Sequence, residues 1–86
     1  MIEGKELRER VDKFVIAFHT TADAMKLETV CKKNGVGERL IPVPHEISAG
    51  CGMAWCADPA DEEILHELME ESGIEPQETR ICSILV

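Results

Sequence analysis

PVPHEISAGCG, residues 42–52, is the stretch around which we expect the fold of this chain to be organised. Its two prolines fix φ near about −65° and remove two backbone hydrogen-bond donors, so a strand that leads into them must end and the chain must turn. Two glycines, Gly50 and Gly52, leave Cys51 without a bulky neighbour in the sequence and allow backbone conformations that are closed to other residues. The stretch indicates a rigid loop that displays a reactive thiol, or else a rigid loop that merely contains a cysteine.

Length and composition indicate one globular domain in a reducing compartment. The 86 residues are 44% hydrophobic and 30% charged, which suits a single packed core and excludes a disordered chain. The formal net charge of −8 would repel phosphate backbones, so we expect no nucleic-acid partner. The amino terminus is charged and no apolar run approaches about 18 residues, so we expect no signal peptide, no membrane partner and a cytoplasmic protein whose cysteines are thiols rather than disulfides.

The hydrophobic pattern predicts four strands and two helices. In the segment of residues 13–18, which is apolar from Phe14 onward, both the odd and the even positions carry apolar side chains, which is typical of a central strand buried on both faces. One helix is expected from a threonine cap, Thr20 or Thr21, to a stop at Asn34-Gly35, and a second from Asp58, which precedes a proline, to a stop at Gly73. The other strands are expected at residues 39–43, 53–57 and 79–86, and residues 1–12 are expected to form a short frayed helix or tail ahead of a domain that spans 13–86.

This order of elements predicts an α+β fold of the ferredoxin-like (βαββαβ) type. Such a sandwich has an antiparallel four-stranded sheet in the spatial order 4-1-3-2, with both helices on one face. The turn after the first strand and the loop of residues 42–52 then share one edge of the sheet, so His19 and the amino-terminal amides of the first helix should lie near Cys51. A helix amino terminus stabilises a nearby anion, and a thiolate, persulfide or selenolate is such an anion.

The proline-rich loop and its surroundings also resemble a known family. Over roughly residues 13–75, the chain is similar to a bacterial family of small proteins described as selenium/sulfur carrier-like. In that family an arginine usually follows the second proline, where this chain has His45, and the first dozen residues look like an addition. The segments that carry the resemblance are Arg39-Leu40-Ile41-Pro42-Val43-Pro44, Glu46-Ile47-Ser48, Cys51-Gly52 and Asp58-Pro59.

The resemblance implies a carrier protein rather than a true enzyme. Cys51 would accept sulfur or selenium as a persulfide or perselenide from a cysteine desulfurase-like donor and pass it to an acceptor protein, with no cofactor beyond that transient group. Gly50 and Gly52 would allow close approach, and Ser48 belongs to the Ser-x-x-Cys-Gly pattern of the loop. His19, His45 and the helix amides would stabilise the anion.

Two alternatives stay open on the sequence alone. The chain could be a protein-interaction or oligomerisation module without chemistry, whose loop docks a partner. It could also be a small metal-binding protein with zinc on His19, His45 and Cys51, although no paired C-x-x-C or H-x-x-x-H spacing is present. His66 has Glu62 and Glu70 one helical turn away, which predicts a solvated ion-pair face.

The other three cysteines are interpreted as structural. Cys31 falls on the apolar stripe of the first helix and Cys82 within the last strand, where unreactive cysteines are usually buried. Cys56 lies five residues from Cys51, and an extended strand would hold their Cα atoms roughly 16 Å apart. A disulfide requires Cα atoms within about 7 Å, so Cys56 is not a resolving thiol. If the helix amino terminus and a histidine lie beside Cys51, its pKa should fall below about 8.5 and make it the most readily alkylated of the four cysteines.

Strand parity predicts a homodimer or a partner packed on the sheet. Met53 and Trp55 should face the helices, which leaves Ala54 and Cys56 on the opposite side together with residues such as Ala17. That side is mostly apolar, and monomers rarely expose contiguous apolar patches larger than a few hundred Å². The face should be covered by a second copy or a partner, or by residues 1–12 folding back.

Overall fold

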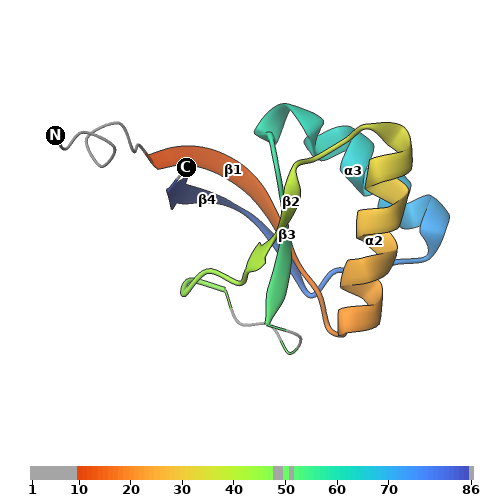
Figure 1. Cartoon of the computed structure of the whole chain (residues 1–86), viewed down its shortest axis with the longest axis horizontal. Helices are drawn as coiled ribbons and strands as arrows, with labels where there is room; N and C mark the ends of the chain where they lie inside the picture. Colours follow the sequence, from red (N-terminus) through yellow and green to blue (C-terminus); the bar gives the residue numbers. More distant parts are fainter. Residues whose placement is uncertain (1–9, 48–49, 51, 86) are drawn as a thin grey trace, which may run out of the picture.

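The computed structural model describes residues 10–47, 50 and 52–85, and over these ranges the chain forms one four-stranded sheet with two α-helices on one face (Figure 1). The strand order is β2-β3-β1-β4 and every neighbouring pair is antiparallel, as expected for the ferredoxin-like α+β fold. The elements are β1 (Arg10–Ala17), α2 (Thr21–Asn34), β2 (Arg39–Pro42), β3 (Met53–Ala57), η1 (Pro59–Asp61), α3 (Glu62–Ser72) and β4 (Glu78–Leu85).

The boundary of the expected tail was placed too late. Residues 10–12 belong to β1, where they pair with residues 83–85 of β4, so the strand begins inside the segment interpreted as a tail of residues 1–12. All three of these residues are exposed, so their own side chains carry no burial pattern that would have indicated a strand. Residues 1–9 lie outside the described part of the chain, so the proposal that the tail covers the sheet is not tested.

Both helices end at the predicted glycines, and α2 begins at a predicted cap, whereas α3 begins four residues after Asp58. The Thr20 side chain accepts a hydrogen bond of 3.2 Å from the Asp23 amide, and Gly35 ends α2 in the left-handed conformation with φ of 66°. Asp58 caps the short 3₁₀ turn η1, which leads directly into α3, by accepting a bond of 2.8 Å from the Ala60 amide. Gly73, with φ of 72°, closes α3.

The main core lies between the helices and the sheet. Trp55 is its largest buried side chain and is 1% exposed. Gly37 lies so close to the indole that a Cβ there would come 2.2 Å from the Trp55 Nε1, so no other residue fits at that position. Ile64 of α3 lies outside this core, because its side chain is 42% exposed although it is large and apolar. The buried residues of this cluster include Phe14, Ile16, Phe18, Ala24, Leu27, Cys31, Leu65, Leu68 and Met69.

The opposite face of the sheet is closed by the chain itself. The parity prediction is confirmed, because Trp55 belongs to the helix-side cluster whereas Ala54 and Cys56 belong to a second cluster on the other side. However, Ala17, Ala54 and Cys56 are 0% exposed, and Ile47 from the β2–β3 loop packs among them. The face is covered, as expected, but by residues of the same chain rather than by a second copy or a partner, so the argument for a homodimer loses its physical basis. The oligomeric state stays a prediction.

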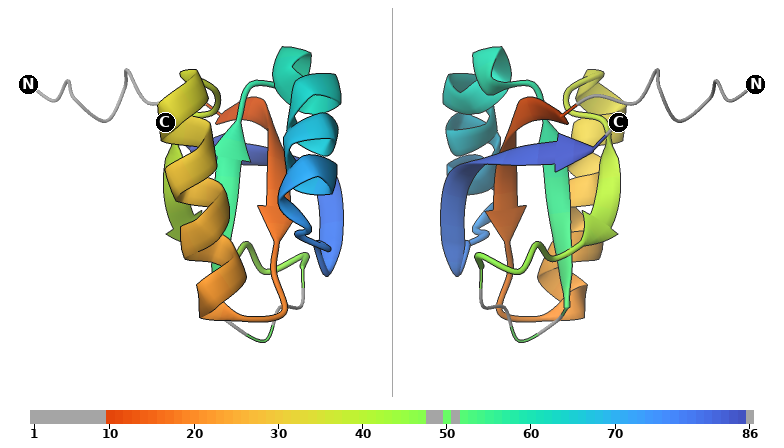
Figure 2. Two further views of the ribbon diagram at one scale, coloured as in Figure 1. Left: turned by 90° about the vertical axis from the view of Figure 1, so that its right-hand side faces the viewer. Right: turned by 90° about the vertical axis from the view of Figure 1, so that its left-hand side faces the viewer.

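The closure comes from the bending of β1 and β4. Residues 14–17 of β1 pair with both β3 and β4, whereas residues 10–13 pair with β4 alone. Two-stranded ribbons twist more strongly than wide sheets, and the end of β4 turns across the face of the sheet that the helices do not cover (Figure 2, right). We call residues 10–13 and 82–85 the arm. The arm and the β2–β3 loop together enclose the second cluster.

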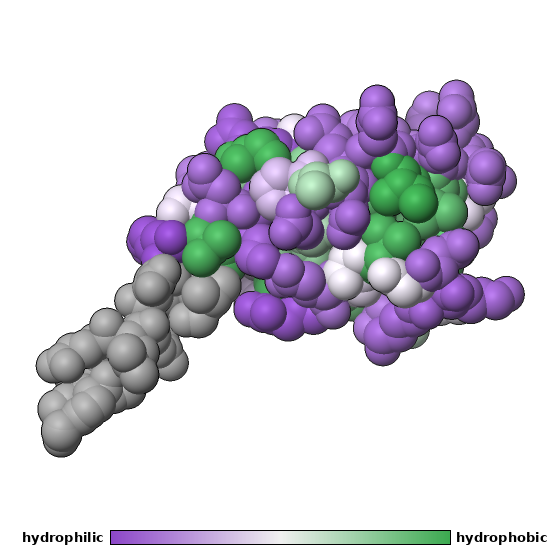
Figure 3. Space-filling model, turned by 90° about the horizontal axis from the view of Figure 1, so that it is seen from above, coloured by the Kyte–Doolittle hydropathy of each residue, from purple (hydrophilic) through white to green (hydrophobic). Residues whose placement is uncertain are grey.

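The outer surface has its apolar groups in separate patches (Figure 3). Seen from above, hydrophilic side chains cover most of the described surface and divide the green patches from one another. Among the described residues, the exposed large apolar side chains are Val11, Met25, Ile64 and Ile81. None of the helices in the described ranges is both long and apolar enough to cross a membrane.

Candidate functional site

The β2–β3 loop is held to the body of the protein at its first half. The Val43 amide donates a hydrogen bond of 3.0 Å to the Gly52 carbonyl, which brings the two ends of the loop together. The Ile47 amide donates to the Pro44 carbonyl at 3.0 Å, and the Ile47 side chain is 4% exposed in the second cluster. Arg80 of β4 donates from Nη1 to the Glu46 carbonyl at 3.3 Å. The loop therefore has a fixed base rather than hanging free of the sheet.

The second half of the loop meets the turn after β1. The Gly50 amide donates a hydrogen bond of 3.2 Å to Oε1 of Gln77, and the Gln77 amide in turn donates to the Ala17 carbonyl at 2.8 Å. A Cβ on Gly50 would lie 3.2 Å from the His19 carbonyl oxygen, so a larger residue would press against that turn. The loop and the β1–α2 turn share one end of the molecule (Figure 1, bottom), as the predicted topology required.

Two of the expected site residues are not described by the structure. Ser48 and Cys51 lie outside the described residues, so their predicted roles are not tested. The residue after Cys51 is placed: Gly52 has φ of 75°, a conformation that favours glycine. The glycine in the Cys-Gly pair is thus required by the backbone, whatever the cysteine does.

The two candidate histidines line different hollows. His19 is exposed and lies in a hollow of about 750 Å³ on the helix side, with Asp23, His66 and Glu70 among its walls. His45 is also exposed and lines a groove of about 440 Å³ between the loop and the arm. The structure therefore does not bring the two imidazoles into one hollow.

Metal binding gains no support from the described residues. Within residues 10–47, 50 and 52–85, no group of three or more histidine, cysteine or carboxylate side chains could hold a metal ion. His66 lies 3.7 Å from Glu62 through Nε2, which confirms the predicted ion-pair face, and its ring is tilted against Phe14 with centroids 5.7 Å apart. The expected third member of a zinc site, Cys51, falls outside the described residues.

The three other cysteines are buried and hard to ionise. Cys31 is 0% exposed, and its burial, assisted by the Asp61 carboxylate, raises the pKa of its thiol to about 11. Burial is also the main cause that raises the pKa of Cys56 and of Cys82, whose exposures are 0% and 3%. A thiolate in these places would lose its water without gaining a cation that compensates. The prediction that Cys31 and Cys82 are core residues is confirmed.

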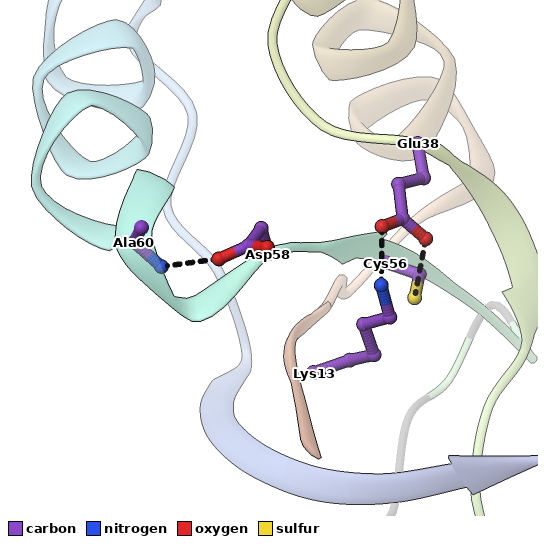
Figure 4. A network of polar contacts seen from close by, with 5 residues as sticks. All are labelled: Lys13, Glu38, Cys56, Asp58 and Ala60. Atoms are coloured by element: carbon purple, nitrogen blue, oxygen red, sulfur yellow. Dashed lines mark hydrogen bonds and ion pairs between the residues drawn. The ribbon is translucent and has the colours of Figure 1, made fainter. Parts of the chain in front are cut away.

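Cys56 has a polar neighbourhood that the sequence did not indicate. Its Sγ lies 3.8 Å from Oε1 of Glu38, and the other carboxylate oxygen of Glu38 pairs with Lys13 of β1 (Figure 4). The Glu38 carboxylate adds to burial in raising the pKa of Cys56, and the same carboxylate raises the pKa of Lys13. These residues are far apart in the sequence and meet only through the β1–β3–β2 pairing, so no local motif could reveal them.

The fold and the site define a class: a small α+β domain with one glycine-flanked cysteine in a proline-rich loop, and with its three other cysteines buried. The family model described as "Putative Se/S carrier protein-like" matches residues 13–80, and the chain belongs to this family. The resemblance seen in the sequence is thereby confirmed. Searches of curated proteins and of solved structures returned no match for the chain.

Proposed function

We propose that the chain carries sulfur or selenium as a persulfide or perselenide on Cys51, accepting it from a donor protein and delivering it to an acceptor. Membership of the selenium/sulfur carrier-like family supports a carrier. The assignment to Cys51 is carried by one observation, the burial of Cys31, Cys56 and Cys82 with raised pKa values. A carrier thiol must ionise and meet two other proteins, and these three side chains suit neither task.

The transfer needs no external oxidant or reductant. The Cys51 thiolate attacks the outer sulfur of a cysteine persulfide on the donor, a new S–S bond forms at Cys51, and the donor cysteine leaves as a thiolate. In delivery, a nucleophile of the acceptor attacks the outer sulfur and Cys51 leaves as a thiolate. Selenium would follow the same two displacements. Each step conserves electrons, because the new bond to the transferred sulfur or selenium atom replaces the bond that breaks to the leaving thiolate.

The surroundings of the loop give the proposed site a means to stabilise an anion. Gly50 lies against the His19 carbonyl, at the end of the molecule where α2 begins with its Thr20 cap. A helix amino terminus carries a partial positive charge that favours a nearby thiolate or persulfide anion. We assign supporting roles in this stabilisation to His19, His45 and the α2 amides, and roles in access to Gly50, Gly52 and Ser48.

The test is a mass measurement with a matched control. The reduced protein is incubated with cysteine and a cysteine desulfurase, and its intact mass is measured for the natural chain, for Cys51→Ser and for Cys82→Ala. We expect a gain of about 32 Da in the natural chain and in Cys82→Ala, and none in Cys51→Ser. A gain that persists in Cys51→Ser, or no gain in any variant, contradicts the proposal.

The non-catalytic alternative is separated by the same measurement. A module that only docks a partner would take up no sulfur at all, yet would keep its loop and its fold. The sequence prediction of an activated thiol stays a prediction, and iodoacetamide labelling of each cysteine across pH tests it. Equal labelling rates at Cys51 and at Cys31, which is 0% exposed, would remove the basis for an activated thiol.

A further inference from the structure

A groove runs between the arm and the β2 side of the sheet. Its volume is about 440 Å³, and it is lined on one wall by Arg10, Ser83 and Ile84 of the arm. The opposite wall comes from Arg39 and Ile41 of β2 and from the first residues of the β2–β3 loop. The groove lies where the end of β4 crosses this face of the sheet (Figure 2, right) and where residues of the arm and of β2 line one hollow. We call it the arm groove.

The arm groove gathers positive charge in an acidic protein. The chain has a formal net charge of −8, yet two arginines, Arg10 and Arg39, line this groove, and Glu46 is the one carboxylate among the described residues of its lining. Arg10 is held in place by a hydrogen bond of 2.9 Å from Nη1 to the Ser83 carbonyl oxygen, which is a neutral acceptor. Within the described ranges, no carboxylate lies at ion-pair distance from either Arg10 or Arg39. Such a pair of guanidinium groups favours an anionic occupant.

Most of the other lining residues are apolar, so the groove offers contacts that a small ion would not use. Ile41, Ile84, Pro42 and Pro44 line the groove between the charged ends, and Ile41 is only 7% exposed. An inorganic anion would use the arginines but leave these apolar side chains uncovered. An occupant that alternates carboxylate and apolar groups would use both kinds of wall.

The edge of β2 also restricts how such an occupant can bind. β2 is an edge strand of four residues, and Pro42 lacks the backbone donor that an added strand would need at its end. A regular β-addition along this edge is therefore short and incomplete. Side chains rather than a continued sheet would hold the occupant in the groove.

We propose that the arm groove binds an extended acidic and apolar segment of a partner protein. A second copy of the chain is disfavoured as the occupant, because two molecules of charge −8 repel each other. The groove adjoins the base of the loop through Pro44 and His45, so a partner bound there lies beside the proposed cargo site. The inference goes beyond the proposed function and does not depend on sulfur chemistry at Cys51.

The test uses the full reduced chain, labelled with ¹⁵N, and two capped hexapeptides. In one peptide glutamate alternates with valine, and in the control peptide lysine alternates with valine. We expect amide shifts at Ile41, Ser83 and Ile84 with the glutamate peptide only. Arg39→Glu should weaken binding about fivefold or more, because it replaces an attractive charge by a repulsive one. Lys26→Glu, the same charge change at an exposed site of α2, should leave binding within about twofold.

Three results would overturn the inference. The first is no shift in the groove with the glutamate peptide, and the second is equal binding by the lysine peptide. The third is an identical pattern produced by sulfate alone at matched ionic strength, which would make the groove a simple anion site. Arg10→Gln serves as a second variant if Arg39→Glu fails to fold. Cys51→Ser should bind the peptide like the natural chain, so failure of the carrier proposal and failure of this one are distinguishable.

Discussion

The two faces of the sheet are closed by different means. On the helix side, α2 and α3 supply most of the cover over a core built around Trp55, with small additions from the loops that follow them. On the other side, the cover is the arm and Ile47 of an irregular loop, over small residues such as Ala54 and Cys56. The first face is built from periodic local patterns. The second is built from strand bending and from one loop contact, and it leaves the arm groove open at its margin.

This difference predicts an unequal division of stability between the two faces. Trp55→Ala should lower the free energy of unfolding by about 4 kcal/mol, because it removes the largest buried side chain and leaves a cavity. Urea denaturation followed by circular dichroism measures the loss. Trp55→Phe is the matched control and should lose clearly less, since the indole Nε1 has no hydrogen-bond partner in the described residues. A loss below about 1 kcal/mol for Trp55→Ala would refute the assignment of this core.

The contact that Ile47 makes on the other face should contribute less to the free energy of unfolding than Trp55 does, but by a measurable amount. Ile47→Ala is expected to cost about 2 kcal/mol, at the low end for such a truncation, because a loop can move to fill part of the space. Ile64→Ala is the matched control: the same change at a side chain that is 42% exposed should cost less than about 0.5 kcal/mol. Equal losses for the two variants would mean that Ile47 does not close the second face.

The buried thiols predict a smaller effect that depends on pH. The pKa of Cys31 is raised by burial from 9.0 to about 11. Below pH 9 the thiol is neutral in both states, whereas above it the unfolded chain loses a proton that the folded chain keeps. Stability should therefore fall as the pH rises from about 9 towards about 11, by about 1 kcal/mol per pH unit from this group.

Urea denaturation at a series of pH values measures this slope. The raised pKa values of Cys56 and Cys82 act in the same direction, so Cys31→Ala should reduce the slope without abolishing it. A stability that stays flat or rises over this range would contradict the burial of the three thiols.

The sequence predicted the helix side well because its signals are local. The caps at Thr20 and Asp58 and the αL glycines Gly35 and Gly73 each act within one helical turn, so reading neighbouring residues is enough. The family resemblance rested on another local signal, the loop motif, and the match of the family model to residues 13–80 confirmed it.

The other face could not be read from the sequence for a physical reason. The alternation of side chains along each strand predicted which residues face away from the helices. The bend that lets the arm and Ile47 cover these residues depends instead on the twist of the whole sheet. Lys13, Glu38 and Cys56 likewise meet only after β1 and β2 have both added to β3. The early start of β1 was missed because residues 10–12 gain their partners from the opposite end of the chain.

The central claim is that, of four cysteines, Cys51 alone carries the cargo. The most direct measurement keeps all four in place: the natural chain is loaded by a cysteine desulfurase, separated from it, alkylated and digested, and the extra sulfur is located by peptide mass spectrometry. We predict that the peptide containing Cys51 carries the added sulfur and that those containing Cys31, Cys56 and Cys82 do not. Added sulfur on any of these three buried cysteines, with none on Cys51, would contradict the account.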